Sequence, residues 1–260
     1  MKKLKLVKYI LLFNLILLAN GFCMDIEISS RNIKLGEVFK VLAKNADTNN
    51  YTLWLDDTPY PLYLIEPTTL RALIGFDFEF KARNCKVNIS PGRVFKTKSI
   101  EKKKNKVLAK ALFTETENQL WEGDFILPLK GRISGRYAEK RIYKKNTGNS
   151  FLTWRGVHSG LDITTGKAGS PIIPSNSGNV ILARHFLGEG NTVVIDHGQG
   201  VVTTYFHLQK IFVKEGSFIK KGETIGTTGS TGIANGPHLH FGVYIHGIPV
   251  DPLFWVSFRG

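Results

Sequence analysis

Cysteine is scarce in this sequence. The chain of 260 residues has only two cysteines, Cys23 and Cys85. This count excludes a disulfide framework, and the sequence has no Cys-x-x-Cys pair for metal binding or redox chemistry. Cys85 lies in a segment of alternating apolar and polar residues, which is typical of an inert buried thiol. Cys23 follows a short apolar run, so a lipid-bearing cysteine and an ordinary cleaved leader are both open interpretations.

A long apolar run is also missing. Lysines at positions 2, 3, 5 and 8 precede the apolar residues 9–22 (YILLFNLILLANGF). A membrane-spanning helix needs about 20 apolar residues, so this segment has the length of a signal peptide instead. Residues 19–21 (Ala-Asn-Gly) suit cleavage. We predict that residues 1–23 form a signal peptide, with an uncleaved membrane anchor as the alternative. The rest of the chain is then exported to the periplasm or cell envelope.

Acidic residues are few relative to basic ones. The chain has 21 Asp and Glu against 35 Lys and Arg, a formal net charge of +14, which falls to +10 without the four leader lysines. Inside the cytoplasm such a charge would indicate nucleic acid. For an exported protein we expect anionic wall polymers or membrane lipids instead, and no nucleic acid. The basic runs at residues 102–104 and 140–145 also fit solvated loops.

Helical periodicity is rare, whereas alternation of apolar and polar residues is frequent. Residues 76–81 and 85–90 alternate in this way, which is typical of half-buried strands. We predict an all-β protein with a small β-sandwich at residues 24–100 and a short helical connector at residues 101–125. Residues 126–260 would form a second β-domain, because NVILA, NTVVIDH, VVTTYFH and HLHFGVYI are strand candidates separated by glycine turns.

Histidine and aspartate recur in the second domain in patterns that suit a metal. HSGLD contains His158 and Asp162, YFHL contains His207, and HLH contains His238 and His240. In a strand, residues i, i+2 and i+4 share a face, so these side chains can converge. A His/His/Asp set with one water forms an open zinc site. The five candidates exceed three ligands, so two histidines remain for proton transfer or for binding the oxyanion.

Each motif also has a simpler interpretation. HLH can be two ordinary strand histidines, His-x-x-x-Asp occurs by chance, and His207 can be a buried core residue. The occurrence of all three motifs in one small domain favours a common site. His185 and His246 fall on predicted loops and are expected to be solvated, and His197 is expected to hold a hairpin turn. The glycine-rich GTTGSTGIANG lacks a Gly-Lys-Ser/Thr ending, so we expect close packing beside a groove, not phosphate binding.

Residues 126–253 resemble the catalytic domain of LytM/lysostaphin-type zinc metallopeptidases, family M23. Tyr137 and Ala138 replace the frequent Phe-Gly of the family, and Gly242 stands where Glu often follows HLHF. Residues 142–155 form an insert that we expect to shape a loop beside the groove. The matching segments are HSGLDITT, SPIIPSNSGNVI, GNTVVIDHGQGVVTTYFHL, VKEGSFIKKGETIGTTGSTGIANGPHLHFGV and IPVDPLFW.

The resemblance implies a role for each residue of the proposed site. His158, Asp162 and His240 resemble the ligands of one Zn²⁺ per chain, and His207 and His238 the two catalytic histidines that do not bind metal. The implied fold is a LytM-like antiparallel β-sheet.

The implied activity is that of a zinc endopeptidase. It would hydrolyse the peptide cross-links of bacterial peptidoglycan in cell-wall remodelling, as a protein that we expect to be a monomer. The bond can be a D-alanyl link to a diamino acid or one in a glycine bridge. The alternative is an inactive LytM-like regulator of other wall hydrolases, which the presence of all five residues disfavours. More loosely, residues 24–100 resemble the Ig-like β-domain found ahead of many such peptidases.

Overall fold

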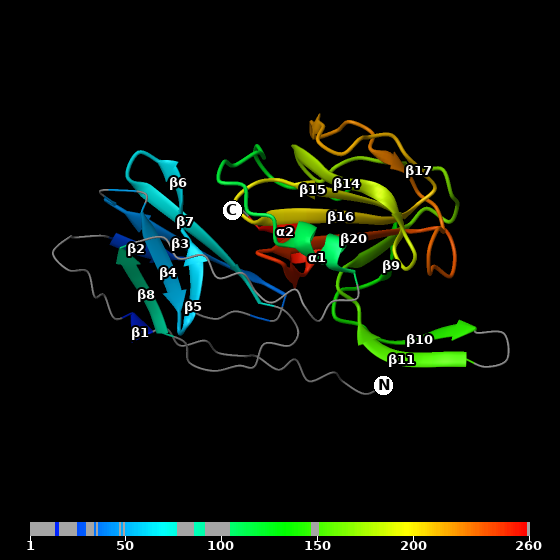
Figure 1. The fold of residues 1–260 in the computed structure, drawn as a ribbon, viewed down its shortest axis with the longest axis horizontal. Helices are drawn as coiled ribbons and strands as arrows, with labels where there is room; N and C mark the ends of the chain where they lie inside the picture. The colour runs from blue at the N-terminus through cyan, green and yellow to red at the C-terminus, as the bar shows by residue number, and fades with distance from the viewer. Residues whose placement is uncertain are drawn as a thin grey trace. The chain divides into compact units, whose positions relative to one another are not determined.

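The computed structural model of the chain describes residues 14–15, 25–29, 34, 36–46, 48, 50–76, 86–91, 105–146 and 151–258. The chain divides into two compact units, Met1–Lys102 and Lys103–Gly260 (Figure 1). Most of the predicted signal peptide, Cys85 and the basic run at 102–104 lie outside the described residues. In the part of the chain that is described, every helix is too short or too polar to cross a membrane.

The described part of the first unit consists of two four-stranded sheets. Neighbouring strands are antiparallel, except that β1 runs parallel to β8. In one sheet the strand order is β1 (Asn14–Leu15), β8 (Lys86–Pro91), β4 (Tyr51–Leu55), β5 (Thr58–Pro61). In the other sheet it is β2 (Asp25–Ile28), β3 (Val38–Lys44), β7 (Thr69–Gly75), β6 (Tyr63–Glu66).

Alternation along these strands produces a single core between the two sheets. Phe39, Val41 and Ala43 follow one another at every second position of β3 and are all buried. They belong to the same apolar cluster as Leu53 of β4 in the other sheet. The unit therefore has the arrangement of a β-sandwich, while its looser resemblance to an Ig-like domain stays a prediction.

The second unit is built around an eight-stranded antiparallel sheet. Its strand order is β18 (Phe218–Ile219), β14 (Gly178–Phe186), β15 (Gly190–Asp196), β16 (Val201–Leu208), β20 (Leu239–Ile245), β12 (Leu161–Thr164), β9 (Arg132–Gly135), with β21 (Ile248–Val250) also paired to β20. A three-stranded sheet follows the order β13 (Pro171–Ile172), β19 (Gly226–Thr227), β17 (Lys210–Ile211). The four strand candidates of the sequence correspond to β14, β15, β16 and β20, and the predicted all-β class is confirmed.

Two elements differ from the expectations. The insert at residues 142–155, expected to be a loop, contributes most of a β-hairpin formed by β10 (Lys140–Asn146) and β11 (Phe151–Val157). The C-terminal segment contains a short helix, α2 (Pro252–Ser257), which periodicity did not predict. Capping explains this helix, because Asp251 accepts a hydrogen bond from the backbone of Leu253 and proline opens the first turn.

The predicted connector packs on the second unit. Its helix α1 (Lys106–Leu112) is capped by Asn105, and Leu108, Ala111 and Leu112 form a cluster with sheet residues that include Val202. Every residue of β16 and β20 is buried, which requires cover on both faces of the sheet. α1 supplies part of that cover (Figure 1).

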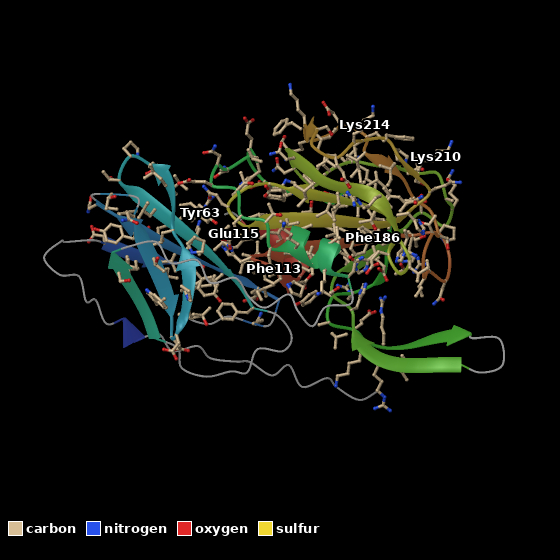
Figure 2. The ribbon with its side chains drawn as sticks, viewed as in Figure 1. Tyr63, Phe113, Glu115, Phe186, Lys210 and Lys214 are labelled. Atoms are coloured by element: carbon tan, nitrogen blue, oxygen red, sulfur yellow. The ribbon has the colours of Figure 1, made fainter. Side chains whose placement is uncertain are left out.

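Two histidines outside the proposed site differ from the expectation that they lie on solvated loops. His246 is buried, and its Nδ1 lies 2.8 Å from Glu115 Oε1 in the segment that follows α1. His185 is exposed as expected, but it lies on strand β14. Lys210 and Lys214 point outward from the second unit (Figure 2), in keeping with solvated basic residues.

Candidate active site and metal centre

Strand register places two of the three proposed ligands on one face of the large sheet. Asp162 on β12 pairs with His240 on β20, and His240 in turn pairs with Phe206 on β16. Paired residues point to the same face, so these three side chains form a row across adjacent strands. Their sequence neighbours Leu161 and Phe241 point to the other face, where both are fully buried. Alternation thus separates the polar site from the apolar core.

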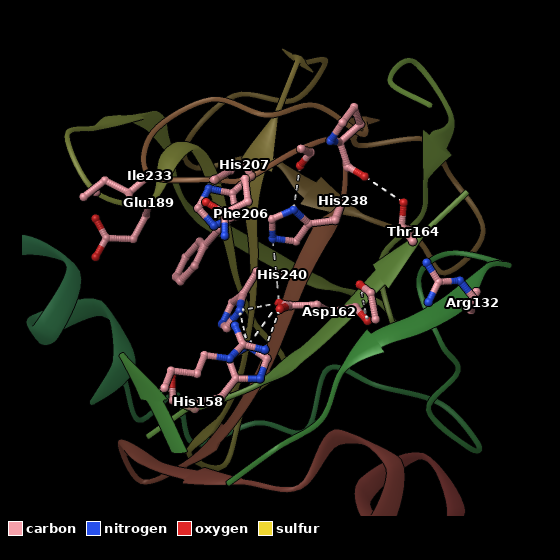
Figure 3. A pocket seen from close by; sticks show the side chains of 18 of the residues that line it. Arg132, His158, Asp162, Thr164, Glu189, Phe206, His207, Ile233, His238 and His240 are labelled. Carbon is pink, nitrogen blue, oxygen red and sulfur yellow. Dashed lines mark hydrogen bonds and ion pairs between the residues drawn. The ribbon is translucent and has the colours of Figure 1, made fainter. Parts of the chain in front are cut away.

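Three candidate ligand atoms converge beside this row, where His158 from the segment between β11 and β12 meets Asp162 and His240. His158 Nε2 lies 3.0 Å from Asp162 Oδ1 and 2.9 Å from His240 Nδ1, and the last two atoms are 3.0 Å apart (Figure 3). All three residues are buried. A tetrahedral zinc ion with bonds of about 2.0–2.1 Å separates its ligands by about 3.3 Å, so the spacing suits such an ion.

The tautomer of His158 supports a metal site. Its Nδ1 lies 2.7 Å from the backbone oxygen of Arg136, so Nδ1 carries the hydrogen and donates it to that carbonyl. The lone pair of Nε2 therefore points toward the oxygen of Asp162 and Nδ1 of His240. Converging lone pairs at this spacing are favourable only when a proton or a cation lies between them. The donor set of two imidazoles and one carboxylate suits Zn²⁺.

The local environment favours the protonation states that metal binding requires. Burial alone would raise the pKa of Asp162, but the hydrogen bonds and positive charge that His158 and His240 provide when protonated outweigh it and hold the pKa well below its usual range. Burial lowers the pKa of His240 despite the opposing effect of Asp162. An ionised carboxylate and a neutral imidazole are the forms that coordinate metals.

The other two histidines lie next to this cluster. The rings of His207 and His238 have centroids 4.9 Å apart, and His238 Nε2 is 3.8 Å from Asp162 Oδ1. His207 ends the regular part of β16 with a backbone φ of 64°, in the left-handed region. A non-glycine residue held there costs about 1–3 kcal/mol. This conformation breaks the strand alternation, so His207 reaches the same site as its neighbour Phe206.

One glycine-rich loop, residues 228–237, orients both of these histidines. The backbone oxygen of Thr231 lies 2.8 Å from His207 Nδ1, and that of Gly236 lies 2.8 Å from His238 Nδ1. Each Nδ1 therefore donates its hydrogen to the loop, and each Nε2 is left with its lone pair. The hydroxyl of Thr164 on β12 donates to the oxygen of Pro237 at 2.7 Å, which anchors the end of the loop (Figure 3).

These loop carbonyls were not identified from the sequence. The only signal was the glycine run itself, which indicated close packing beside a groove. That packing is observed, because a side chain at Gly229 would lie 2.8 Å from the backbone oxygen of His207.

The five side chains line a groove of about 980 Å³. Phe206, Ile233 and Glu189 stand on one side of the histidine cluster, and Thr164 and Arg132 stand on the other side (Figure 3). The groove thus has an apolar wall, an acidic group and a basic group around the proposed ligands.

The chain is similar to known cell-wall peptidases. Residues 156–252 match the family described as Peptidase family M23. Peptidoglycan DD-endopeptidase ShyA of Vibrio cholerae is 37% identical over 125 residues, which are 48% of this chain and 27% of that protein. ShyB of the same organism, also a peptidoglycan DD-endopeptidase, is 42% identical over 129 residues, 47% of this chain and 30% of that protein. The chain therefore spans less than a third of the length of these relatives.

A solved structure agrees with the fold. The crystal structure of a peptidase M23 from Pseudomonas aeruginosa superimposes with a TM-score of 0.58 at 24% identity and covers 86% of this chain and 95% of that chain. At this identity the likeness concerns the fold. The family match over residues 156–252 of the second unit agrees with the resemblance that the sequence predicted, and the solved structure agrees with the fold alone.

Proposed function

We propose that this protein is a zinc endopeptidase that hydrolyses peptide cross-links of bacterial peptidoglycan. The observation that carries the proposal is the convergence of His158, Asp162 and His240 within 3.0 Å, on the floor of a groove that two further histidines enter. The similarity to ShyA and ShyB supports the substrate class. An inactive regulator is not favoured, because all five side chains are present and face one groove.

The proposed ligands would hold one Zn²⁺ through His158 Nε2, Asp162 Oδ1 and His240 Nδ1. When bound, zinc would supply a water of pKa about 7 and polarise the substrate carbonyl. This chemistry requires a group that removes a proton from the water and returns it to the leaving amine. The ligands themselves are unsuited to that task, because their lone pairs would be used in coordination.

His207 and His238 suit the proton transfer. Burial lowers the pKa of His207 to about 4, so its imidazole is neutral at neutral pH. Because each Nδ1 hydrogen is donated to the loop, each Nε2 begins as a proton acceptor. A histidine that has taken a proton can then donate a hydrogen bond to the oxyanion or pass the proton to the leaving nitrogen. Two such histidines allow these tasks to be divided.

The charges of the groove favour one cross-link over the other. Glu189 and Arg132 lie on opposite sides of the ligand cluster (Figure 3). A D-alanyl link to a diamino acid offers carboxylates for a guanidinium and an amine for a carboxylate. A glycine bridge offers only neutral peptide groups. We therefore propose the D-alanyl link as the bond that is cleaved.

The test is digestion of two purified cell walls of defined chemistry, one with D-alanyl links to a diamino acid and one with glycine bridges. We expect release of fragments that end in D-alanine from the first wall, identified by mass, and loss of this activity after zinc is removed with a chelator. Cleavage of the glycine-bridged wall alone would contradict the assigned bond. If the zinc-bound protein cleaves neither wall, the proposal that it is a peptidoglycan endopeptidase is wrong.

We also propose that the protein acts outside the cytoplasm, in the periplasm or cell envelope. The basic leader and the short apolar run support export. A net charge of +10 without the four leader lysines, and exposed lysines such as Lys210 and Lys214, support contact with anionic wall polymers or membrane lipids.

A further inference from the structure

The geometry points to Arg141 as a positioning residue of the metal centre, which fixes how Asp162 presents its carboxylate. Arg141 comes from the β10–β11 hairpin, outside the ligand motifs. Its Nη2 lies 2.8 Å from Asp162 Oδ2, the carboxylate oxygen that faces away from the two histidines. Asp162 Oδ1 lies 3.0 Å from both His158 and His240. The two oxygens of Asp162 thus have different partners.

Because Asp162 is buried, each of its two carboxylate oxygens needs a partner within the protein or the metal site. The side chain of Asp162 is 9% exposed, so its oxygens have little access to water. A buried carboxylate oxygen without a partner is costly, and it would tend to rotate toward the ligand cluster. With Oδ2 bound by Arg141, only Oδ1 is available as a ligand. Partners outside the ligand shell commonly hold metal-binding carboxylates in this way.

Gly135 leaves the space that the contact needs. Gly135 is paired with Asp162 across β9 and β12. A β-carbon at this position would lie 2.7 Å from Asp162 Oδ2 and would overlap the guanidinium of Arg141. The backbone φ of Gly135 is not positive, so the reason for glycine here is space and not conformation. A methyl group at position 135 would therefore displace Arg141.

The positive charge of Arg141 opposes a nearby divalent cation, but Glu139 offsets it. Glu139 Oε2 lies 3.2 Å from the same Nη2 of Arg141. The pair brings little net charge to the centre, so the hydrogen bond to Asp162 decides the effect of Arg141. We therefore expect removal of Arg141 to weaken metal binding. The inference rests on the proposed metal site.

The experiment measures zinc affinity of the full chain by competition with a chromogenic chelator. We expect Arg141→Gln to bind zinc on the order of 10–100-fold more weakly than the parent, with an unchanged far-ultraviolet circular dichroism spectrum. Arg141→Lys should recover part of the loss, because it keeps a cationic donor. Lys140→Gln removes an exposed charge from the same strand, outside the groove, and should bind zinc like the parent.

A second variant tests the geometry without removing a polar group. Gly135→Ala should weaken zinc binding to a similar extent by displacing Arg141. In the Arg141→Gln background the same change should cost less than it does in the parent, because both substitutions break the contact between Arg141 and Asp162. Additive losses would indicate two unrelated defects and would overturn the inference.

The outcomes separate this inference from the proposed function. If the parent binds no zinc, the proposed metal site fails. If the parent binds one zinc per chain and Arg141→Gln binds it equally well or more tightly, the metal site stands and the positioning role of Arg141 is wrong. An equal loss in Lys140→Gln would show a general charge effect and would also overturn the role.

Discussion

The two histidines of HLH differ in their surroundings, so we expect their substitution by alanine to affect zinc binding differently. We expect His240→Ala to lose bound zinc, because it removes one of three ligands. We expect His238→Ala to keep near-stoichiometric zinc but to lose on the order of 10²–10⁴-fold in turnover. His207→Ala should behave like His238→Ala. Metal analysis and wall digestion of the three variants check this prediction.

The folding of these variants serves as the control. His207 and His238 line a groove, so their truncation should leave the circular dichroism spectrum unchanged. If His238→Ala empties the site and His240→Ala leaves it full, the assignment of ligands is reversed. If every variant digests wall like the parent, the protein is not this enzyme.

His197 predicts a loss of stability in mild acid. It is fully buried, and its nitrogens lie 2.7 Å from the oxygen of Ser177 and 2.7 Å from the hydroxyl of Thr203. Burial lowers its pKa from 6.5 to about 4, although the Ser177 bond opposes this. Between pH 6.5 and 4 the unfolded chain therefore binds a proton that the folded chain rejects. Stability is full above pH 6.5 and falls by about 3 kcal/mol as pH drops to 4.

Chemical denaturation at several pH values tests this effect in the parent and in His197→Gln. The glutamine variant lacks the titrating group, so its stability should fall less steeply with decreasing pH. Between pH 6.5 and 4 the slopes of parent and variant should differ by about 1.4 kcal/mol per pH unit. Its stability at neutral pH will itself be lower, and the comparison therefore uses the slope. Equal slopes would show that His197 does not titrate as its burial implies.

At the residue scale, the sequence predicts contacts that follow from the spacing of residues along one strand. HLH is extended as predicted, and the register of β12 and β20 brings Asp162 and His240 together. His158 lies between β11 and β12 and not on a strand, so its contact with Asp162 does not follow from strand alternation. The contact of His246 with Glu115, 131 positions apart, depends on tertiary packing that no local pattern contains. The same holds for Arg141, because its partner Asp162 is reached only after the hairpin folds back.

At the element scale, we expect a substitution in the glycine-rich loop to lower turnover without changing the amount of bound zinc. Gly232 has a φ of 75°, and a side chain there would overlap the backbone of Gly188 and Gly190. We expect Gly232→Ala to displace the loop and with it the carbonyl of Thr231 that orients His207. Turnover should fall on the order of 10–100-fold, since small displacements of catalytic groups have such effects. Zinc content should stay at the parental level, because no proposed ligand lies on the loop.

Gly236 offers a matched control in the same loop. Its φ is not positive, and no atom beyond its neighbours lies within 4 Å of a β-carbon placed there. Gly236→Ala keeps the backbone carbonyl that accepts from His238 and adds no clash, so it should digest wall at a rate near that of the parent. If the two alanine variants are equally impaired, loop composition and not the contact at Gly232 sets the rate. If neither is impaired, the loop does not orient His207.

Elements were predictable where the chain repeats a pattern over several residues. The apolar and β-branched runs of β14, β15, β16 and β20 identified the central strands. Two-residue strands such as β13 and β19 contain no periodicity and form because neighbouring strands pair with them. Residues 142–155 are predicted to shape a loop only because they form an insert relative to the family pattern, whereas the β10–β11 hairpin arises from pairing of two segments of the insert with each other.

At the scale of the whole molecule, the leader predicts a shortened native protein. The four lysines and the apolar residues 9–22 indicate export, and the small residues at 19–21 indicate cleavage. We expect mass spectrometry of protein purified from the envelope to show a chain that lacks at least residues 1–21. An intact Met1 in a soluble cytoplasmic pool would contradict export. An intact Met1 in the membrane fraction would instead indicate an uncleaved anchor.

The division into two units predicts where an independently folding domain begins. The compact second unit starts at Lys103. Its connector is hydrogen-bonded to the residue that follows β15, because the backbone N–H of Leu120 donates to the oxygen of His197 at 2.8 Å. α1 covers part of the sheet with Leu108 and Leu112. Burial of each leucine contributes about 1.5–3 kcal/mol. We therefore expect residues 103–260 to fold and bind zinc, and residues 126–260 to be less stable by about 3 kcal/mol or more.

Denaturation of both fragments by urea, together with zinc analysis, measures this difference. Both fragments retain all proposed ligands, so both should bind zinc wherever they are folded. Equal stability would show that α1 contributes nothing and that the domain begins near residue 126, as the sequence resemblance alone suggested. If residues 103–260 stay unfolded with zinc present, the second unit depends on the first. In that case the packing of α1 on the sheet is not enough for the second unit to fold by itself.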